Sequence, residues 1–467
     1  MKRRTKIVCT LGPATATKEK IHELIAAGMN VARINCSHGT WEERAQVIKW
    51  IREACSEIAP IGILVDLQGP KFRVGVLPVE GLPIKTGETV TIGADDESQI
   101  PLFRDAVFAA MRTGDRVLLG DGEIELKVGE QIGDHFKAKV ISGGTVKSKK
   151  GITLVGKSFD APCITDRDQN DIVEAAKNGA DFIALSYVRS AADMKELRFR
   201  VSQLDPSIKL CAKIETPEAV KELDEIIHQS DLIMVARGDL GLQMDIEDVP
   251  GVQKKIIDRC FHAGRPVITA TQMLESMMNA ARPTRAEASD VANAIWDGTD
   301  AVMLSGETAA GQYPIEAVNV MSRIAVKAEK MLDFDDRLHD AKKASGVDDE
   351  TDEVGRAAVQ LAKNLGVKAI VTTSTTGTTP RLVSRFRPSV PIYCACWQAK
   401  TQAFLSVVWG VEAALTPLPI STEAAIAQAV DPFHRSKRLK SGDKIIVTAG
   451  VPAGTPGSTN LILVQKV

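Results

Sequence analysis

A lysine and a glutamate, Lys213 and Glu215, end the apolar run KLCAKIE that begins at Lys209. Because they are two residues apart on a predicted β-strand, their side chains share one face. Inside a barrel neither charge is stable without a partner, so a structural ion pair is the simplest interpretation. The alternative is a chemical site, in which Asp239 of the following segment ARGDLG joins Glu215 to hold a divalent cation.

Two carboxylates suit Mg2+, which takes few protein ligands, keeps several waters and accepts substrate oxygens. Gly238 stands next to Asp239 and leaves room for a ligand beside the backbone. Arg33, Arg73 and Lys213 supply cations that could bind phosphate without a Walker-type loop. Mg2+ together with converging cations points to phosphoryl transfer.

These residues need a scaffold, and eight short apolar runs, most of them followed by a helical segment, predict one. The runs begin at Lys6, Asn30, Ile61, Asp181, Lys209, Asp231, Pro266 and Ala301. Thr40 with Glu43 and Thr284 with Glu287 have the spacing of capping boxes and mark helix starts. Strands that are apolar along nearly their whole length are typical of parallel sheets buried on both faces. The pattern predicts a (β/α)8 TIM barrel rather than a doubly wound open sheet.

Two stretches do not fit the barrel repeat. The connection between Gln68 and Thr165 is far longer than an ordinary loop, and its Gly-punctuated, β-rich texture predicts an inserted small β-barrel that acts as a lid. After the charged stretch 333–353, helices and strands alternate again and predict a C-terminal α/β domain. The predicted domains are residues 1–69 and 166–340 for the barrel, 70–165 for the lid and 341–467 for the C-terminal domain.

In a (β/α)8 barrel the active site lies at the carboxyl ends of the strands. Read in order, these ends carry Thr10, Arg33, Asn35, Ser37, Asp66, Ser186, Lys213, Glu215, Arg237, Asp239, Thr271, Ser305 and Glu307. Any one of them alone could be a turn-forming residue. So many polar side chains on one ring predict a functional site.

Composition limits the partners. With 58 Lys and Arg against 60 Asp and Glu, the net charge of -2 gives no overall electrostatic reason to bind nucleic acid or an anionic membrane. The N-terminal apolar run is too short for a secretory signal and no later run reaches membrane length, so we expect a cytoplasmic protein. Eight scattered cysteines without a Cys-x-x-Cys pair predict reduced core residues rather than zinc ligands or disulfides.

Several segments together resemble the pyruvate kinase family. They are TKIVCTLGPAT, GMNVARINCSHG, VDLQGPKFR, CAKIETPEAVKELDEI, DLIMVARGDLG, ITATQMLESM and PTRAEASDVANAIWDGTDAVMLSGETAAGQYPIEAV. The resemblance runs from Thr5 to about Val320 with high specificity and continues more weakly to the C-terminus. It implies Mg2+-dependent transfer of phosphate from phosphoenolpyruvate to ADP, giving pyruvate and ATP, and a homotetramer.

The resemblance also implies residue roles. Glu215 and Asp239 would hold Mg2+, and Lys213 would stabilise the transferring phosphoryl group. Arg33 would bind the phosphate, and Gly238 and Thr271 the carboxylate end of the substrate. Thr271 and Ser305 could pass a proton to the enolate through water. The positions that match the nucleotide side are Asn35, His38, Arg73 and Lys150.

Two other functions stay open at this point. A Mg2+-dependent aldolase or lyase acting on pyruvate enolate would share the Glu-Asp metal site, but it would not need Arg73, Lys150 and a lid. A catalytically inactive metabolite sensor is disfavoured by the intact Lys213, Glu215 and Asp239. The basic run that contains Lys150 could also be a solvated hairpin.

The segment Gln68-Gly69-Pro70-Lys71 departs from the Lys-Gly-Pro-Glu of many family members. Those members need a K+ ion held by an Asn, a Ser, an Asp and the carbonyl after the Asp. The matching candidates here are Asn35, Ser37, Asp66 and Leu67. Lys71 brings an ammonium where the family has an acid, so we predict that K+ is not required. The alternative is that Lys71 only points to solvent at the hinge of the lid.

The C-terminal segment VTTSTTGTTPRLVSRFRP predicts a strand, a polar turn and a helix that carries Arg381, Arg385 and Arg387. This is either a phosphate cradle at a helix N-terminus or an ordinary turn. In the family the matching turn often binds a phosphorylated allosteric effector, and AGVPAGTPGSTN resembles the loop that closes over it. The turn lacks Lys and Arg, so the effector stays open; its residues are Thr373, Ser374, Thr375, Thr376, Gly377 and Thr378.

Overall fold

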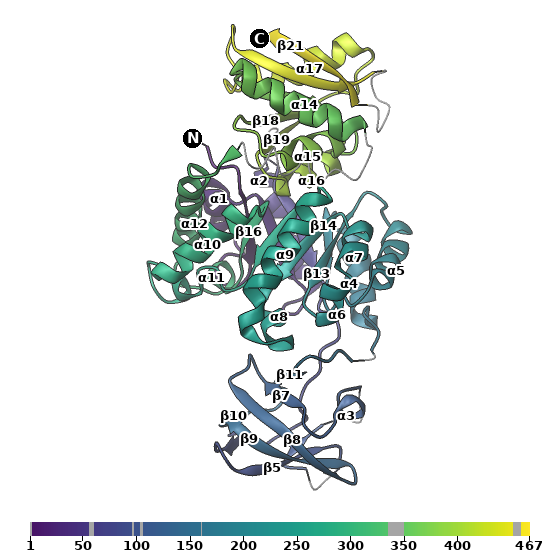
Figure 1. The fold of residues 1–467 in the computed structure, drawn as a ribbon, viewed down its shortest axis with the longest axis vertical. Helices are drawn as coiled ribbons and strands as arrows, with labels where there is room; N and C mark the ends of the chain where they lie inside the picture. Colours follow the sequence, from purple (N-terminus) through teal and green to yellow (C-terminus); the bar gives the residue numbers. More distant parts are fainter. Residues whose placement is uncertain are drawn as a thin grey trace.

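The computed structural model describes residues 2–55, 60–95, 98–102, 106–159, 161–334, 350–451 and 459–467. Eight parallel strands close into a barrel in the order β1-β16-β15-β14-β13-β12-β3-β2 (Figure 1). Their bounds are β1 Lys6–Leu11, β2 Val31–Asn35, β3 Gly62–Asp66, β12 Phe182–Leu185, β13 Lys209–Ile214, β14 Leu232–Ala236, β15 Val267–Ala270 and β16 Ala301–Leu304. The predicted (β/α)8 barrel is confirmed, and all eight strands lie in the predicted runs.

Helices surround the barrel. They are α1 Lys18–Ala27, α2 Trp41–Ala54, α4 Asp166–Lys177, α5 Ala191–Ser202, α6 Pro217–Lys221, α7 Leu223–Gln229, α8 Arg237–Gln243, α9 Val249–His262, α10 Arg285–Asp297, α11 Gly306–Ala309 and α12 Pro314–Glu329. Thr40 and Thr284 form complete capping boxes, as predicted. The last of these helices, α12, begins at Pro314, because the fixed φ of proline suits the first turn of a helix.

The lid is built from the segment between β3 and α4 and lies at the lower end of Figure 1. Its strands form a six-stranded sheet, β11-β7-β8-β9-β5-β6, and a two-stranded sheet, β10-β4, and they enclose one apolar core. The strands are β4 Leu82–Ile84, β5 Thr89–Gly93, β6 Ile100–Pro101, β7 Arg116–Leu119, β8 Ile124–Ile132, β9 His135–Ser142, β10 Gly144–Val146 and β11 Ile152–Leu154. One short helix, α3 Ala106–Ala110, lies between β6 and β7.

The C-terminal unit, at the upper end of Figure 1, is a five-stranded sheet in the order β19-β18-β17-β20-β21. Its elements are α14 Glu350–Leu365, β17 Ala369–Thr373, α15 Thr378–Arg385, β18 Ile392–Cys396, α16 Ala399–Phe404, β19 Val411–Leu415, α17 Thr422–Arg435, β20 Lys444–Gly450 and β21 Thr459–Lys466. Most of the charged stretch predicted as a boundary lies outside the described residues.

The C-terminal unit closes the amino ends of the barrel strands. Arg387 pairs with Asp300, just before β16, at 2.9 Å, and Lys6 of β1 donates to the carbonyl of Val411 at 2.6 Å. Phe182 inside the barrel and Phe404 of α16 have ring centroids 6.3 Å apart and share one apolar cluster. The amino end of the barrel is therefore sealed by apolar packing, which leaves the carboxyl end as the open one.

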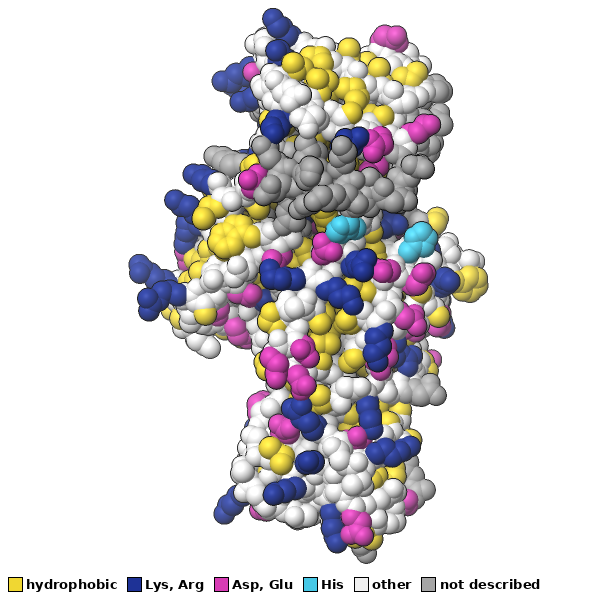
Figure 2. Space-filling view, in the orientation of Figure 1, with side chains coloured by type: hydrophobic (Ala, Val, Ile, Leu, Met, Phe, Trp, Pro, Cys, Tyr) yellow, Lys and Arg dark blue, Asp and Glu magenta, His cyan; other side chains and the backbone are white. Residues whose placement is uncertain are grey.

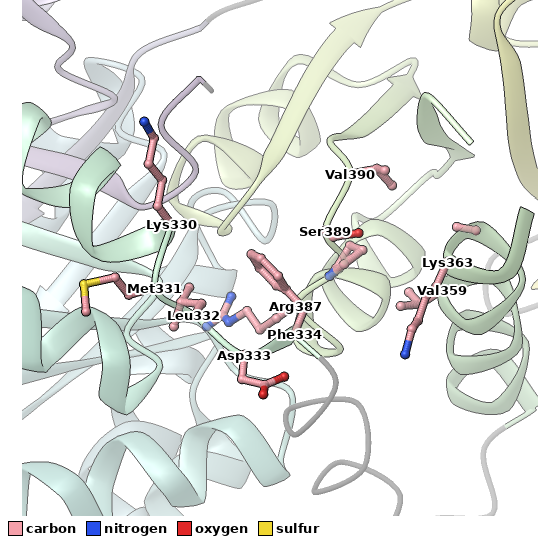
Figure 3. A pocket seen from close by; sticks show the side chains of 12 residues that line it. Lys330, Met331, Leu332, Asp333, Phe334, Val359, Lys363, Arg387, Ser389 and Val390 are labelled. Atoms are coloured by element: carbon pink, nitrogen blue, oxygen red, sulfur yellow. The ribbon is translucent and has the colours of Figure 1, made fainter. Parts of the chain in front are cut away.

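A cavity of about 470 Å³ lies beside this junction (Figure 3). The segment 330–334 after α12, the helix α14 and the segment 387–390 contribute its lining, and Figure 3 shows Arg387 and Phe334 close together within it. Arg387 is already committed to Asp300, so this cavity belongs to the junction and is separate from the strand ends that carry the predicted chemistry.

Two further predictions can be compared with the structure. The eight cysteines are free, and only Cys55 is less than fully buried, which confirms reduced core residues. Within the described part of the chain, no helix combines the length and the apolar character that a membrane crossing requires.

Candidate active site

A cleft of about 650 Å³ separates the carboxyl ends of the barrel strands from the lid. Figure 2 shows Lys and Arg side chains beside Asp and Glu side chains along the seam between these two parts. From the barrel side the cleft is lined by Arg33, Asn35, Ser37, Asp66, Ser186, Lys213, Glu215 and Asp239, and from the lid side by Arg73, Asp121, Lys147, Lys149 and Lys150. Eight of the thirteen polar strand-end residues that the sequence analysis named therefore lie together in the lining of this cleft.

Asp66, the last residue of β3, neutralises two cations at the floor of the cleft. Its Oδ2 lies 2.7 Å from Nε and 2.5 Å from Nη2 of Arg33, and its Oδ1 lies 3.3 Å from Nζ of Lys213. Burial alone would raise the pKa of Asp66, but Lys213 and Arg33 outweigh burial and hold the pKa below its ordinary value. Asp66 is therefore a fixed negative charge.

Lys213 lies between two carboxylates. Its Nζ donates to Oγ of Ser186 at 2.7 Å and is 2.7 Å from Oε1 of Glu215. Burial works to lower the pKa of Lys213, but the carboxylates of Asp66 and Glu215 raise it above its ordinary value. The structural ion pair between Lys213 and Glu215, which was the simplest interpretation of the sequence, is present. It belongs to a larger buried charge cluster that opens into the cleft.

Glu215 and Asp239 are the residues that could hold a metal ion. Oε2 of Glu215 accepts the backbone N–H of Tyr187 at 2.8 Å, and the buried Oε1 lies 2.7 Å from Nζ of Lys213. Burial, with the nearby carboxylate of Asp239, raises the pKa of Glu215 to about 7 against the opposing effect of Lys213. Two carboxylates in the lining of one cleft fit a hard divalent cation.

Asp239 does not lie on a strand, as the sequence interpretation had it, but in the first turn of α8. The chain turns into this helix directly after β14, which leaves the Asp239 side chain exposed at the cleft. In the described ranges there is no group of three or more His, Cys, Asp or Glu that could hold a metal ion. A metal at Glu215 and Asp239 would therefore complete its shell with water or substrate oxygens.

Lys71 points toward the polar group at the ends of β2 and β3. Its Nζ donates to Oγ of Ser37 at 3.0 Å, and Ser37 N–H in turn donates to Oδ1 of Asn35 at 3.0 Å. The carbonyl of Leu67 accepts the hydroxyl of Ser186 at 2.8 Å. Desolvation in the cleft and the neighbouring Arg73 lower the pKa of Lys71, although Asp239 opposes this shift.

The residues predicted for the nucleotide side are only partly brought together. Arg73 donates to the carbonyl of Lys149 at 2.7 Å, and Lys150 pairs with Glu123 at 3.3 Å, both on the lid side of the cleft. His38 is exposed and lies outside the cleft lining; its carbonyl accepts a hydrogen bond from Arg44 at 2.7 Å.

Thr271 and Ser305 directly follow β15 and β16, and neither lies in the lining of the cleft. Oγ1 of Thr271 accepts the N–H of Gly238 at 2.8 Å, and its φ of 67° is a strained conformation for a threonine. Oγ of Ser305 is buried without a hydrogen-bond partner. Both features are typical of side chains held ready for a ligand.

Two of the predicted strand-end residues, Arg237 and Glu307, do not line the cleft and instead bind neighbouring parts of the barrel. Arg237 pairs with Asp290 at 2.7 Å and donates to the carbonyl of Ala270 at 3.2 Å. Glu307 is fully buried and accepts the backbone N–H groups of Leu274 and Ser305. Strand-end position alone could not distinguish these two residues from the ones that face the cleft.

Tyr187 is a residue of this region that the sequence analysis did not single out. It directly follows Ser186 and binds Glu215 through its backbone. Its position just past a strand end was the only available signal.

The predicted effector turn lies between β17 and α15. Gly377 has a φ of 87° and donates its N–H to Oγ of Ser374 at 2.9 Å. The arginines predicted to cradle a phosphate do not do so. Arg381 donates to the carbonyl of Gly264, Arg385 pairs with Asp352 at 3.0 Å, and Arg387 pairs with Asp300.

The prediction of an arginine cradle is therefore wrong, because these side chains hold α15 and the residues after it to the barrel and to α14. The loop expected to close over the turn falls at 452–458, outside the described residues.

Comparisons with known proteins agree on one family. The model described as "Pyruvate kinase, barrel domain" matches residues 2–318, and the model "Pyruvate kinase, alpha/beta domain" matches residues 352–465. The pyruvate kinase of Geobacillus stearothermophilus is 44% identical, with 100% of this chain and 81% of the relative covered; that of Bacillus licheniformis is 42% identical, with 100% and 80% covered. A crystal structure of a pyruvate kinase from Cryptosporidium parvum has a TM-score of 0.93 at 37% identity, covering 99% of this chain and 96% of that one.

The charge cluster predicts a stability effect at Asp66. In Asp66→Asn, Arg33 and Lys213 would lie side by side in a buried site without their shared counter-charge, so we expect a loss of about 3 kcal/mol in the stability of the barrel. Differential scanning calorimetry of the ligand-free protein should show a melting temperature several degrees below that of the parent.

The matched control is Asp121→Asn, which removes an exposed carboxylate from the lid side of the same cleft. It should change the stability by no more than about 0.5 kcal/mol. Equal melting temperatures for the Asp66→Asn protein and the parent would contradict the role given to Asp66.

Proposed function

This chain belongs to the pyruvate kinase family, and on that premise we propose which of its residues carry out the reaction. The enzyme is a phosphotransferase that moves the phosphoryl group of phosphoenolpyruvate to ADP and releases pyruvate and ATP, with the Mg2+ dependence that the family implies. The observation that carries the residue roles is the cluster of Arg33, Asp66, Lys213 and Glu215, because it presents fixed charges to a cleft of about 650 Å³.

Glu215 and Asp239 are the Mg2+ ligands in this proposal, supported by the position of both carboxylates in the lining of the cleft. Mg2+, when bound there, supplies positive charge for substrate oxygens. Lys213 and Arg33 place cations at the floor of the cleft, where they stabilise the negative charge that spreads over the transferring group. Asp66 keeps both cations in place and charged.

The substrate's carboxylate end lies against Gly238 and Thr271 in this proposal. The strained backbone of Thr271 and the unpartnered hydroxyl of Ser305 support a role near the enolate, where the two hydroxyls pass a proton through water. Asn35, Arg73 and Lys150 bind the nucleotide in this proposal, supported by their position in the lining of the cleft. His38, which is exposed outside that lining, would contact the outer edge of the nucleotide.

We also propose the organisation of the protein. Its domains are residues 1–69 and 166–340 for the catalytic barrel, 70–165 for the lid and 341–467 for the C-terminal domain. The sheets support this division, because the closed barrel, the two sheets of the lid and the five-stranded C-terminal sheet share no strand. The working form is a cytoplasmic homotetramer, which is an inference from the family alone.

K+ is not required in this proposal, because all four candidate oxygen ligands already have partners. Oγ of Ser37 accepts from Lys71 and Oδ1 of Asn35 accepts from the Ser37 amide. Asp66 is paired with Arg33, and the Leu67 carbonyl accepts from Ser186. The ammonium of Lys71 supplies a fixed positive charge at this place, where a diffusible ion would otherwise be needed.

A phosphorylated effector is the proposed ligand of the turn Thr373–Thr378. The support is the turn's geometry: it follows a strand and leads into the N-terminus of α15, which favours anions. The committed arginines limit the site to backbone N–H and hydroxyl groups. The effector therefore stays defined only as a phosphate ester.

Lys213→Met tests the role at the transition state. We expect kcat to fall by about a thousandfold or more, while the binding of Mg2+ and of phosphoenolpyruvate stays within about fivefold, since the lost interaction is made mainly in the transition state. A coupled assay for pyruvate gives the rate, and calorimetry gives the melting temperature. A modest rate loss together with a collapsed melting temperature would instead make Lys213 a structural ion-pair partner.

K+ independence is tested in tetramethylammonium buffer with Mg2+ but no K+. The parent enzyme should have full activity, and Lys71→Glu should acquire a K+ requirement because the substitution exchanges the fixed cation for an anion. Lys147→Glu, the same charge reversal at the lid side of the cleft, should create no K+ requirement. Strong activation of the parent by K+ would overturn the proposal.

The effector proposal predicts that a sugar phosphate or AMP lowers the apparent KM for phosphoenolpyruvate. Titration at sub-saturating phosphoenolpyruvate measures the response. Thr376→Asp places a negative charge in the turn and should abolish it, because the anion would be repelled. Flat kinetics with every compound in the parent enzyme would show that the turn is an ordinary polar connection.

A further inference from the structure

Tyr187 contacts the proposed metal site through its backbone. It lies two residues after the end of β12, and its N–H donates to Oε2 of Glu215 at 2.8 Å. Its φ of 59° is in the left-handed region, where a tyrosine is strained. A strained conformation persists only where its surroundings hold it.

The side chain of Tyr187 belongs to the lid. Its ring is buried in the lid's apolar cluster, with a centroid 5.8 Å from that of Phe72, and Phe72 in turn is 4.3 Å from Phe159. The phenolic oxygen accepts the backbone N–H of Phe159 at 2.6 Å. Tyr187, whose backbone belongs to the barrel, therefore uses its side chain to hold the chain segment that returns from the lid.

Both connections to the lid meet at this residue. Phe72 lies in the segment that leaves the barrel after β3, and Phe159 lies in the segment that returns to α4. Arg189 strengthens the junction: its guanidinium is 5.6 Å from the Tyr187 ring centroid and donates to the carbonyls of Phe159 at 2.6 Å and Ala161 at 2.8 Å.

We propose that Tyr187 is a positioning residue that couples the lid to the orientation of the Glu215 carboxylate. The inference rests on the proposed role of Glu215 as a Mg2+ ligand. The phenol anchors the residue to the lid and the backbone N–H anchors it to Glu215, so the strained backbone is held from both ends. If the phenol anchor is lost, the backbone can relax and the N–H no longer fixes the carboxylate.

This coupling acts in both directions. A metal ion bound at Glu215 favours the backbone position that keeps the phenol on Phe159, and so it should slow local opening of the lid's return segment. The return segment, when it is anchored, should in turn raise the affinity for the metal. Metal affinity and lid opening are therefore two readouts of one contact.

Tyr187→Phe removes only the phenolic oxygen and keeps the ring in the apolar cluster. The backbone N–H of Phe159 then loses its acceptor, and the Tyr187 backbone that holds the Glu215 carboxylate can relax. Titration of the substrate-free protein with Mn2+, followed by electron paramagnetic resonance, should therefore show an affinity about tenfold weaker than that of the parent. Hydrogen–deuterium exchange at residues 152–159 should be faster, and Mn2+ should no longer slow it.

Tyr393→Phe is the matched control. Tyr393 is also buried and stacks on Phe433 at 4.5 Å, but it lies in the C-terminal sheet. This variant should bind Mn2+ as the parent does and leave exchange of the lid segment unchanged, which would support a specific effect of Tyr187.

A Mn2+ affinity of Tyr187→Phe within twofold of the parent would overturn the inference, and so would a lowered melting temperature without a change in affinity. Glu215→Gln separates this failure from failure of the metal site itself. If Glu215→Gln binds Mn2+ as tightly as the parent, the metal assignment is wrong and the inference falls with it. If only Glu215→Gln loses affinity, the metal site stands and the coupling through Tyr187 is refuted.

Discussion

The structure of the site depends on a balance of buried charge at the mouth of the barrel. Asp66 holds Arg33 and Lys213, and Lys213 is shared with Glu215, so two cations and two carboxylates cancel within hydrogen-bond distance. Removing any one member would leave a charge without its partner in a site that excludes most water. A divalent cation and a substrate phosphate together add opposite charges, so both can enter without upsetting this balance. The four side chains of the cluster therefore carry no net charge together.

The fold opens the carboxyl end of the barrel, where the charge cluster lies, to the cleft, and it closes the amino end by apolar packing. The parallel register places Asn35 beside Asp66, and Arg33 beside Leu64, so that polar side chains collect at the carboxyl ends. At the amino ends, Phe182 packs toward Phe404 of the C-terminal unit. In the described part of the chain, Lys213 lines the cleft beneath the lid, and the chain segment that returns from the lid contacts Tyr187 at the same cleft.

Local patterns predicted the scaffold well, because strand periodicity and helix caps depend on neighbouring residues. Asp66 at the end of β3, Lys213 next to the end of β13 and the cap at Thr40 are examples. Partner choice was not predictable, since it depends on groups distant in the chain. Arg385 pairs with Asp352 of α14 and Arg387 with Asp300 of the barrel, although their sequence context suggested a phosphate cradle.

The central claim is that the carboxylates beside Lys213 hold a divalent cation, and a crystal grown with Mn2+ tests it most directly. Anomalous scattering should place one Mn2+ ion between Glu215 and Asp239. Nζ of Lys213 should then have left Glu215 while it still contacts Asp66. An anomalous peak that touches neither carboxylate, with the Lys213–Glu215 pair intact, would contradict the account.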